Sequence, residues 1–339
     1  MSDPIYQIRN LRQRYNGPPV LDIHRLDIDR GMVTGIQGPN GSGKTTFLRL
    51  LAFIDIPWKG EIGFNSRGAG PFSEHPRLAV TFLPQTPSLL QRTVYKNVCY
   101  GLKIRGIRED IDTRVEKALS MVGLSMAAFG HRRPHALSGG EAQRVALAAR
   151  MAVKPKVLLL DEPTANVDTE SAQRIKQAAH DAKTRWNTTV IVISHDSQWL
   201  YEGCDRILQM YQGRAWDTGN RNVVPGPWQP SADGNWETRL ADGQGVAASP
   251  PPRPDATALV ELSFDRPETG RPETVKGIEA MVTRLILEKK TGRIAVSLLA
   301  GDLVFTITTS PSQIEQKQLY PGKKRTVFYA PDHVEWLVP

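Results

Sequence analysis

One run of nine residues near the start of the chain has the types and spacing of a phosphate-binding loop. The run is Gly38-Pro39-Asn40-Gly41-Ser42-Gly43-Lys44-Thr45-Thr46, and it lies between an apolar strand-like run and an apolar helix-like run. In such a loop the glycines let successive backbone N–H groups curl around a phosphate, the lysine reaches the β- and γ-oxygens, and the threonine hydroxyl ligates Mg²⁺. The segment therefore predicts binding of a nucleoside triphosphate.

A second apolar run ends in two carboxylates. Val157-Leu158-Leu159-Leu160 shows no alternation, which is typical of a parallel strand buried on both faces, and Asp161 and Glu162 follow it. Beside a phosphate loop, Asp161 is placed to hold Mg²⁺ through water, and Glu162 to deprotonate the water that attacks the γ-phosphate. An isolated Asp-Glu pair is more often a solvated acidic turn, but the loop upstream favours the catalytic interpretation.

Between these two motifs, Ser138-Gly139-Gly140 opens an amphipathic helix within the run Leu137 to Arg144. The start of that helix is a second place where exposed N–H groups favour an anion. Within one chain it has no obvious use, because the loop from Gly38 to Thr45 already holds one triphosphate. Across a dimer, it would close over the γ-phosphate of the partner's nucleotide.

The run LSGGEAQR resembles the signature of ATP-binding cassette (ABC) ATPases, and other motifs of that family follow in its order over roughly residues 5 to 220. The resemblance implies an α/β P-loop fold with a RecA-like core, an antiparallel β subdomain and a helical subdomain at about 86–150. It implies ATP and Mg²⁺ as ligands and ATP hydrolysis as the activity. It also implies a head-to-tail homodimer in which each ATP lies between the two chains.

Four further residues match positions that the family uses. Tyr15 resembles the aromatic residue that stacks on adenine; a half-buried tyrosine at a strand end is the alternative. Gln85 resembles the glutamine that contacts Mg²⁺ and the lytic water. His195 resembles the switch histidine on the γ-phosphate, with a strand-capping histidine as the alternative. Asp168 matches the loop that contacts the opposite monomer, although Ala-Asn-Val-Asp stands where the family more often has Ser-Ala-Leu-Asp.

Together these motifs predict three sets of site residues. The catalytic set is Glu162, His195 and Gln85, and the metal set is Thr45, Gln85 and Asp161. The nucleotide-binding set is Tyr15, Gly38, Asn40, Gly41, Ser42, Gly43, Lys44, Thr45, Thr46, Ser138, Gly139 and Gly140.

The composition of the 339 residues, 40% hydrophobic and 23% charged, is that of a soluble globular protein with room for two domains. No run reaches membrane-spanning length and no secretory signal opens the chain, so we expect it neither to span the membrane nor to leave the cell. Cys99 and Cys204 match no metal spacing and are interpreted as reduced thiols. The net charge of +8 is scattered, which favours phosphates and an anionic membrane face over nucleic acid.

Strand-like runs at 5–9, 20–28 and 60–64 predict the antiparallel subdomain, and apolar residues at helical spacing predict helices at 94–104, 115–124 and 170–183. In the ABC family the helical subdomain receives a short helix from a membrane-spanning permease. The resemblance therefore implies separate permease subunits, a peripheral position on the cytoplasmic face of the membrane, and indirect work with a periplasmic or extracellular binding protein.

The composition changes after about Gly219. Pro225, Pro227, Pro230 and the run Ser249 to Pro254 predict a domain boundary. We assign 1–219 to a nucleotide-binding domain, 220–256 to a Pro-rich linker or hairpin extension with a hairpin at 233–247, and 257–339 to an accessory domain. Strand-like runs at 280–285, 294–298, 303–307 and 326–329 predict that this last domain is a small all-β, barrel-like unit.

The tail resembles the Mop-like or TOBE-like β-domain of importer ATPases, through Thr309 to Ile314 followed by Leu319 to Gly322. Where that family usually has Lys-Ala-Ser near a bound oxyanion, this chain has Tyr329-Ala330-Pro331-Asp332, which removes a cation and adds a carboxylate. An oxyanion ligand at this domain and a barrel that only braces the ATPase dimer both remain open.

The resemblance as a whole is greatest to tungstate and molybdate importer ATPases. We therefore predict the ATP-hydrolysing subunit of a membrane importer for one of these oxyanions. Importers of sulfate, iron, sugars or polyamines with similar tails are one alternative. The others are a cytoplasmic oxyanion sensor and a soluble ABC ATPase acting on ribosomes or DNA; that last class usually has two cassettes in one chain or long coiled-coil inserts, and neither is present.

Overall fold

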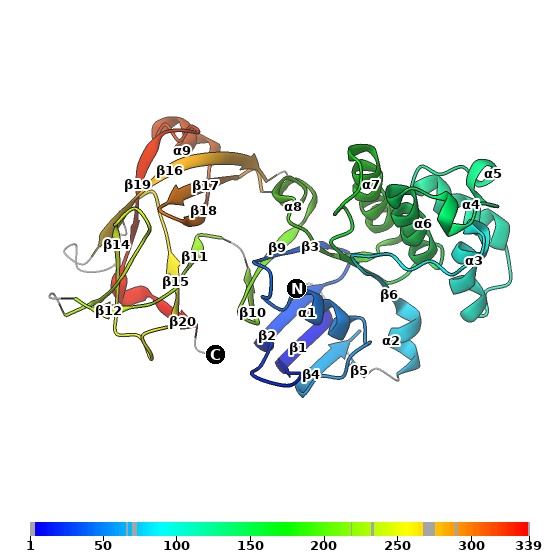
Figure 1. The fold of residues 1–339 in the computed structure, drawn as a ribbon, viewed down its shortest axis with the longest axis horizontal. Helices are drawn as coiled ribbons and strands as arrows, with labels where there is room; N and C mark the ends of the chain where they lie inside the picture. The colour runs from blue at the N-terminus through cyan, green and yellow to red at the C-terminus, as the bar shows by residue number, and fades with distance from the viewer. Residues whose placement is uncertain are drawn as a thin grey trace. The chain divides into compact units, whose positions relative to one another are not determined.

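The chain divides into two compact units, Met1–Asp217 and Thr218–Pro339, each with its own hydrophobic core (Figure 1). The structure is a computed structural model, and it describes residues 4–65, 67–69, 73–217, 219–231, 234–266, 275–288 and 291–337.

A six-stranded sheet in the order β10-β9-β3-β8-β7-β6 forms the centre of the first unit. The strands from β9 to β6 run parallel, and β10 closes the edge antiparallel. Every residue of β7 and β8 is buried, as their unbroken apolar sequences require. The strands are β3 (Val33–Gln37), β6 (Val80–Leu83), β7 (Val157–Asp161), β8 (Thr189–Ile193), β9 (Arg206–Tyr211) and β10 (Arg214–Asp217).

A second sheet of the first unit, in the order β2-β1-β4-β5, is antiparallel and confirms the strands predicted at 5–9, 20–28 and 60–64. Its inner face packs on α1 (Lys44–Leu51), and the Tyr6 hydroxyl donates a hydrogen bond to the Leu51 carbonyl at 2.8 Å. The phosphate loop is therefore held between two sheets. The strands are β1 (Pro4–Gln13), β2 (Leu21–Asp29), β4 (Lys59–Phe64) and β5 (Arg67–Ala69).

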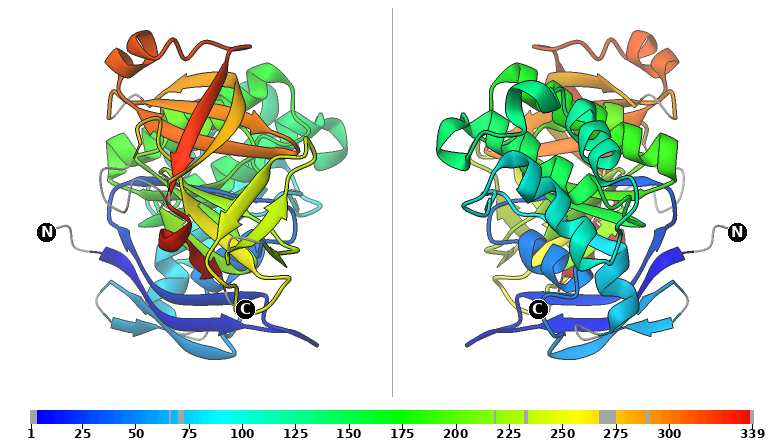
Figure 2. Two further views of the ribbon diagram at one scale, coloured as in Figure 1. Left: turned by 90° about the vertical axis from the view of Figure 1, so that its left-hand side faces the viewer. Right: turned by 90° about the vertical axis from the view of Figure 1, so that its right-hand side faces the viewer.

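Helices α3, α4, α5 and α6 gather on one side of the first unit (Figures 1 and 2). The helices predicted at 94–104 and 170–183 are confirmed as α3 and α7, whereas the one predicted at 115–124 begins four residues earlier and ends at Met121. No helix in the described part of the chain is long and apolar enough to cross a bilayer. The helices are α2 (Glu74–Ala79), α3 (Val94–Ile104), α4 (Ile111–Met121), α5 (Met126–Phe129), α6 (Gly139–Met151), α7 (Thr169–Trp186) and α8 (Ser197–Gly203).

The second unit consists of three antiparallel sheets, in the orders β18-β17-β16-β19, β11-β15-β20 and β12-β13-β14. All four strand-like runs predicted for the tail are confirmed, within β16, β17, β18 and β19. The elements are β11 (Arg221–Val224), β12 (Gln229–Pro230), β13 (Trp236–Arg239), β14 (Gly245–Ala248), β15 (Thr257–Glu261), β16 (Lys276–Leu287), β17 (Ile294–Ala300), β18 (Leu303–Thr309), α9 (Pro311–Gln316), β19 (Lys324–Tyr329) and β20 (Glu335–Leu337).

The proline-rich region between 220 and 256 belongs to the core of this second unit. Trp228 is 1% exposed, donates its ring N–H to the Ala256 carbonyl at 2.8 Å, and meets the ring of Trp336 edge-on at 5.0 Å. The hairpin β13–β14 places Val246 in the same cluster. Asp233, where the predicted hairpin begins, lies outside the described residues.

Side-chain amides cover the free edge of β18. Asn222 donates to the Thr306 carbonyl at 3.0 Å and accepts from the Thr306 N–H at 2.7 Å, and Asn220 accepts from the Thr308 N–H at 2.9 Å. These amides satisfy backbone groups that a neighbouring strand would otherwise pair with.

Candidate nucleotide site

A pocket of about 650 Å³ opens at the carboxyl ends of the central strands, and its size is typical of small-molecule sites. It collects eleven of the predicted residues from segments far apart in the sequence. These are Asn40, Gly41, Ser42, Gly43, Lys44, Thr45, Thr46, Gln85, Asp161, Glu162 and His195. Five predicted residues are not among the described lining residues, namely Tyr15, Gly38, Ser138, Gly139 and Gly140.

The order of the strands explains this collection. Strand β8 lies between β3 and β7, so His195, two residues beyond β8, lies between the loop that follows β3 and the carboxylates at the tip of β7. Because the three strands are parallel, all their carboxyl ends reach the same edge of the sheet. Gln85, just beyond β6, comes from the next strand along.

Two glycines of the loop are required by their surroundings. Gly38 has a φ of 152°, and a Cβ there would lie 2.0 Å from the Met210 carbonyl oxygen. Gly43 has a φ of 95°, and a Cβ there would lie 2.8 Å from the Val20 carbonyl oxygen. Since Gly43 is also the N-cap of α1 and offers no side chain, the first N–H groups of the helix are left for an anion.

Two polar side chains of the loop also fit an anion. The Lys44 ammonium donates to the carbonyls of Gly38 and Pro39, at 2.8 and 3.0 Å, so it lies over the loop itself. Burial lowers the pKa of Lys44, an effect that the nearby Glu162 and Asp161 oppose. The Ser42 hydroxyl is buried and has no hydrogen-bond partner among the described residues.

The residues predicted for the metal offer oxygen ligands on one side of the pocket. Asp161 is 3% exposed; burial raises its pKa, while a hydrogen bond with the Thr45 hydroxyl and the charge of Lys44 lower it. Gln85 adds an amide oxygen to the lining. Hydroxyl, carboxylate and amide oxygens suit Mg²⁺, which usually takes few protein ligands beside substrate phosphates. No cluster of three or more His, Cys, Asp or Glu able to hold a metal occurs in the described part of the chain.

Glu162 adopts a backbone conformation that residues other than glycine rarely take, with a φ of 46°. The hydrogen bond from its N–H to the Ile193 carbonyl, at 3.0 Å, holds this turn against β8. Its side chain is largely buried, and His195 Nε2 lies 3.1 Å from its Oε1. Strained positions of this kind gather at functional sites, and this one directs a carboxylate into the pocket.

The remaining predicted residues lie elsewhere on the first unit. Tyr15 is 55% exposed, and its hydroxyl lies 3.3 Å from Asp55, which Arg49 holds through two hydrogen bonds. Its ring is therefore oriented and free to stack. Ser138 caps α6 by accepting from the Glu141 N–H, and the Glu141 carboxylate accepts from the Ser138 N–H in return.

The sequence analysis did not assign several residues that line the pocket. Thr164, Ala165 and Asn166 are three of them, and their position directly after the two carboxylates was the available signal. Val20, in the loop before β2, also lines the pocket, and no local pattern marks it. Ala172, Ile193, Ser194 and Asp196 complete the lining.

Comparison with known proteins identifies the family. Residues 21–165 match the family model described as ABC transporter. The tungstate uptake system ATP-binding protein TupC of Peptoclostridium acidaminophilum is 37% identical over 208 residues, which cover 61% of this chain and 94% of that protein. The chain belongs to the ABC transporter family. The α/β P-loop fold and the ATPase class predicted from the sequence are thereby confirmed.

This ABC ATPase is also similar to a sulfate/thiosulfate import ATP-binding protein CysA of Mesostigma viride, at 36% identity over 61% of this chain and 59% of that protein. Among solved structures it is similar to a dimeric ATP-binding cassette in a post-hydrolysis state bound to ADP and Pi. The TM-score is 0.58 and the identity 26%, over 63% of this chain and 97% of that one. The alignment covers 94% of TupC but only 61% of this chain. More than a third of this chain therefore has no counterpart in that alignment.

With Asp161 as the Mg²⁺ ligand that the sequence predicts, its raised pKa predicts a pH dependence for Mg²⁺ binding. Burial makes this carboxylate take up a proton at a higher pH than a free aspartate does, and a protonated carboxyl is a poor Mg²⁺ ligand. We expect the Mg²⁺-dependent part of ATP binding to weaken as the pH falls through this raised pKa. Mg²⁺ titrations with a fluorescent ATP analogue at a series of pH values measure this loss of Mg²⁺-dependent binding.

Asp161→Asn should weaken Mg²⁺ binding at neutral pH and remove this pH-dependent step, because it leaves no proton to bind. Asp112→Asn, on α4 away from the pocket, is the matched control and should titrate like the unmodified protein. An unchanged pH profile in Asp161→Asn would assign the effect to another group.

Proposed function

We propose that this chain is the ATP-hydrolysing subunit of a membrane importer and works as a homodimer with two ATP molecules between the chains. The observation that carries the proposal is the pocket in which a phosphate loop, two carboxylates, Gln85 and His195 meet. The similarity to TupC, an uptake-system ATP-binding protein, supports the importer class.

In this proposal the predicted residues of the pocket share the work of binding and hydrolysis. The N–H groups of the loop and Lys44 bind the phosphates, and Asp161, Thr45 and Gln85 hold Mg²⁺, which when bound neutralises charge on the phosphate oxygens. Glu162 takes a proton from the attacking water as that water's oxygen bonds to the γ-phosphorus and the bond to the β-γ bridging oxygen breaks. His195, whose Nε2 lies 3.1 Å from Glu162 Oε1, contacts the γ-phosphate.

The start of α6 is best explained by a second copy of the chain. Nothing in the described structure lies within 4 Å of a Cβ added at Gly139, so this turn is open to an outside group. The turn does not line the pocket of its own chain. We therefore assign Ser138, Gly139 and Gly140 to the γ-phosphate of the partner's ATP. Tyr15 is assigned separately, to stacking on an adenine ring. The dimeric form of a similar cassette supports this arrangement.

An exposed apolar face along α3 suits a permease. Tyr100 and Ile104, one turn apart, are 42% and 62% exposed. Two more exposed leucines are bonded through their backbones to residues of α3 or its C-cap: Leu90 to the Asn97 side chain, and Leu78, through its carbonyl, to Arg105. Exposed apolar patches of this kind mark protein interaction sites. We assign this α3 face to a helix of the permease, which would place the chain peripherally on the cytoplasmic face of the membrane and link it indirectly to a binding protein.

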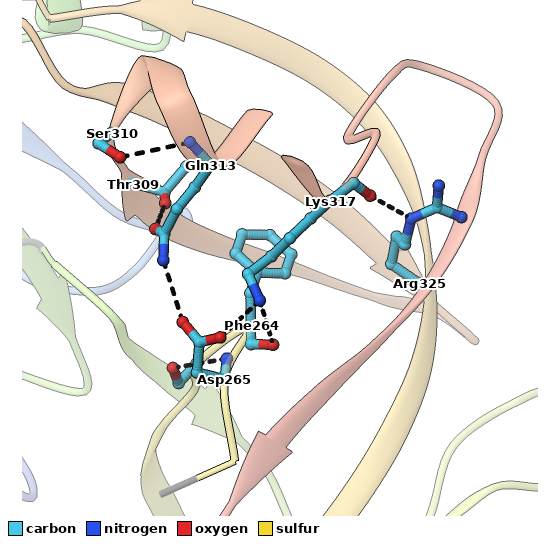
Figure 3. Close-up of polar contacts among 8 residues, drawn as sticks. Phe264, Asp265, Thr309, Ser310, Gln313, Lys317 and Arg325 are labelled. Atoms are coloured by element: carbon cyan, nitrogen blue, oxygen red, sulfur yellow. Dashed lines mark hydrogen bonds and ion pairs between the residues drawn. The ribbon is translucent and has the colours of Figure 1, made fainter. Parts of the chain in front are cut away.

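The contacts within the tail bear on the cargo. In Figure 3, Asp265 lies between Gln313 and Lys317 and accepts a hydrogen bond from each. Thr309 donates to Gln313, and Ser310 caps the same residue. The polar groups that would meet an oxyanion here already bind one another, and the nearest ammonium is neutralised by a carboxylate. We therefore base tungstate as cargo on the similarity to TupC, with sulfate as the alternative from the similarity to CysA. Molybdate stays a prediction from the sequence alone.

Replacing the proposed base tests the hydrolytic mechanism. Glu162→Gln keeps the shape of the side chain but cannot accept the proton, so we expect the hydrolysis rate to fall by about 10²–10⁴-fold with ATP binding retained. Steady-state hydrolysis and equilibrium binding of labelled ATP measure the two effects. Lys44→Ala, in contrast, should weaken ATP binding itself. If Glu162→Gln hydrolyses ATP at the rate of the unmodified chain, Glu162 is not the base.

A charge placed on the α3 face tests docking to the membrane partner. Ile104→Asp should release the chain from the native membrane fraction, because an exposed apolar contact is replaced by a carboxylate that must be desolvated. Hydrolysis by the purified chain should be unchanged, since Ile104 is not among the residues that line the pocket. Glu116→Ala, on the exposed side of α4, is the control and should stay membrane-bound. If Ile104→Asp stays on the membranes, the permease binds another surface of the chain.

A calorimetric titration of the full chain tests the tail. We expect tungstate, molybdate and sulfate to bind the second unit weakly or not at all, because Asp265 competes for Lys317. Asp265→Asn should then increase binding by freeing the ammonium. Tight binding of tungstate to the unmodified chain, lost in Lys317→Ala, would instead establish an oxyanion site in the tail.

A further inference from the structure

The residues on either side of His195 are more firmly held than His195 itself. Its side chain is 59% exposed, so its position depends on the backbone that carries it. Ser194 is 2% exposed, and its N–H donates to the Ile36 carbonyl of β3 at 3.4 Å. The Ser194 hydroxyl accepts from the Asp196 N–H at 3.0 Å, which closes a tight turn around the histidine. Residues 194–196, called here the histidine turn, are thus fixed to the sheet at their start.

The carboxylate of Asp196 fixes the other end of the histidine turn. Its Oδ1 accepts from the Trp199 N–H at 3.1 Å and so caps α8, and its Oδ2 accepts from the Lys176 ammonium at 2.5 Å. Burial alone would raise the pKa of Asp196, but the ammonium and the N–H groups of α8 outweigh burial, and the pKa is lowered. The carboxylate therefore stays charged, and it lines the pocket.

Lys176 belongs to α7, which packs beside α8 (Figure 1). It lies one turn after Ala172, which lines the pocket, so the two residues share one side of the helix. Its side chain is 28% exposed, and its ammonium lies 5.7 Å from the centre of the buried Trp199 ring. A carboxylate and an aromatic ring thus define the place of the ammonium, unlike that of a lysine in a solvated surface pair.

The start of α8 does not require this lysine. One oxygen of Asp196 is sufficient to cap the helix, and that oxygen is Oδ1, which the Trp199 N–H already engages. The bond from Lys176 goes to the second oxygen and joins α7 to the histidine turn. The ion pair therefore adds a constraint on the turn beyond what the helix cap supplies.

A second ion pair of the same kind on α7 offers a comparison. Two turns beyond Lys176, the Lys183 ammonium lies 3.1 Å from an Asp205 carboxylate oxygen, and the Asp205 carboxylate also accepts from the Val33 N–H at 2.8 Å. Neither Lys183 nor Asp205 is among the described lining residues of the pocket. Helix α7 thus carries one lysine–aspartate pair beside the histidine turn and one that joins it to the sheet away from the site.

We propose that Lys176 is a positioning residue for His195, which fixes the far end of the histidine turn through Asp196 and so holds the imidazole at the γ-phosphate. The inference rests on the contact between His195 and the γ-phosphate proposed above. Lys176 is not among the described lining residues, so it acts through the turn and not by touching the nucleotide. With Ser194 bonded to β3 and Asp196 bonded to α7, the backbone of His195 is fixed on both sides.

Binding of the β,γ-imido analogue of ATP, compared with binding of ADP, isolates the contact with the γ-phosphate. His195→Ala in the full chain should weaken binding of the imido analogue and leave ADP binding near that of the unmodified chain. Lys176→Met keeps most of the side-chain length but not the charge, and should weaken binding of the imido analogue alone by about fivefold, within the range for coupled residues in contact. Lys176→Arg should restore it. Calorimetric titration measures each affinity.

Lys183→Met is the matched control, because it breaks the same kind of ion pair on the same helix. The Asp205 side chain is 4% exposed and that of Asp196 36%, so Lys183→Met should lower the melting temperature at least as much as Lys176→Met does. The ratio of the two nucleotide affinities should nevertheless stay that of the unmodified chain. If Lys183→Met changes this ratio as Lys176→Met does, the effect is a general loss of stability and the proposal is overturned.

A double variant tests whether Lys176 acts through His195. Lys176→Met together with His195→Ala should bind the imido analogue no more weakly than His195→Ala alone, because a positioning residue has no effect once the group that it positions is gone. A further loss would overturn the proposal and show that the ammonium acts on the phosphate through its charge.

The single variants distinguish two failures. If His195→Ala weakens binding of the imido analogue but Lys176→Met does not, the positioning role is wrong and the proposed contact of His195 stands. If His195→Ala itself changes nothing, the proposed contact with the γ-phosphate is wrong, and the role of Lys176 falls with it.

Discussion

The parallel alignment of β3, β8 and β7 is the constraint on which the site depends. Each strand is too apolar to lie anywhere but inside a sheet, and its polar residues follow it at one end. Burying the strands side by side therefore delivers the loop, the histidine and the two carboxylates to one edge without any direct attraction among them. The hydrophobic effect assembles the site, and the polar contacts within it only adjust side chains.

That assembly brings opposing charges into a buried place. Lys44 faces Asp161 and Glu162, and burial opposes the charged form of both Lys44 and Asp161. A triphosphate adds further negative charge, so a divalent cation is needed on electrostatic grounds as well as for the chemistry. The balance explains why the loop supplies so many N–H groups: they favour an anion without adding a mobile charge.

Much of this was predictable from the sequence, and the reason differs between the units. In the first unit the decisive signals are local, because a loop of glycines, a buried strand and a strand-tip carboxylate each require particular residue types. The pocket brings eleven of the predicted residues together, whereas Val20 enters only through tertiary packing that no local pattern encodes. Similarly, the pairing of Asp196 with Lys176 becomes apparent only from the neighbouring helix.

In the second unit, proline content leaves the interpretation of 220–256 open between a linker and a hairpin extension. Prolines suggest an extended connector, yet Trp228, which stands among them, is one of the largest fully buried side chains of the chain. Prolines stiffen a chain but do not keep it out of a core when an aromatic residue anchors it. The strands of the tail were more readily found, since alternation survives in β16 and β19.

The amides of Asn220 and Asn222 along β18 have a consequence for the life of the protein in a crowded cell. An uncovered sheet edge recruits strands from other molecules and can seed fibres, and covering it with a full strand would require more chain. Here two side chains occupy the hydrogen-bonding groups of the edge. The amide of asparagine, however, slowly hydrolyses to a carboxylate. Chemical ageing of Asn222 would replace its amide donor by a carboxylate oxygen facing the Thr306 carbonyl, whereas the oxygens that accept from the Thr306 and Thr308 N–H groups would remain acceptors. The protection of this edge at the Thr306 carbonyl therefore has a finite lifetime.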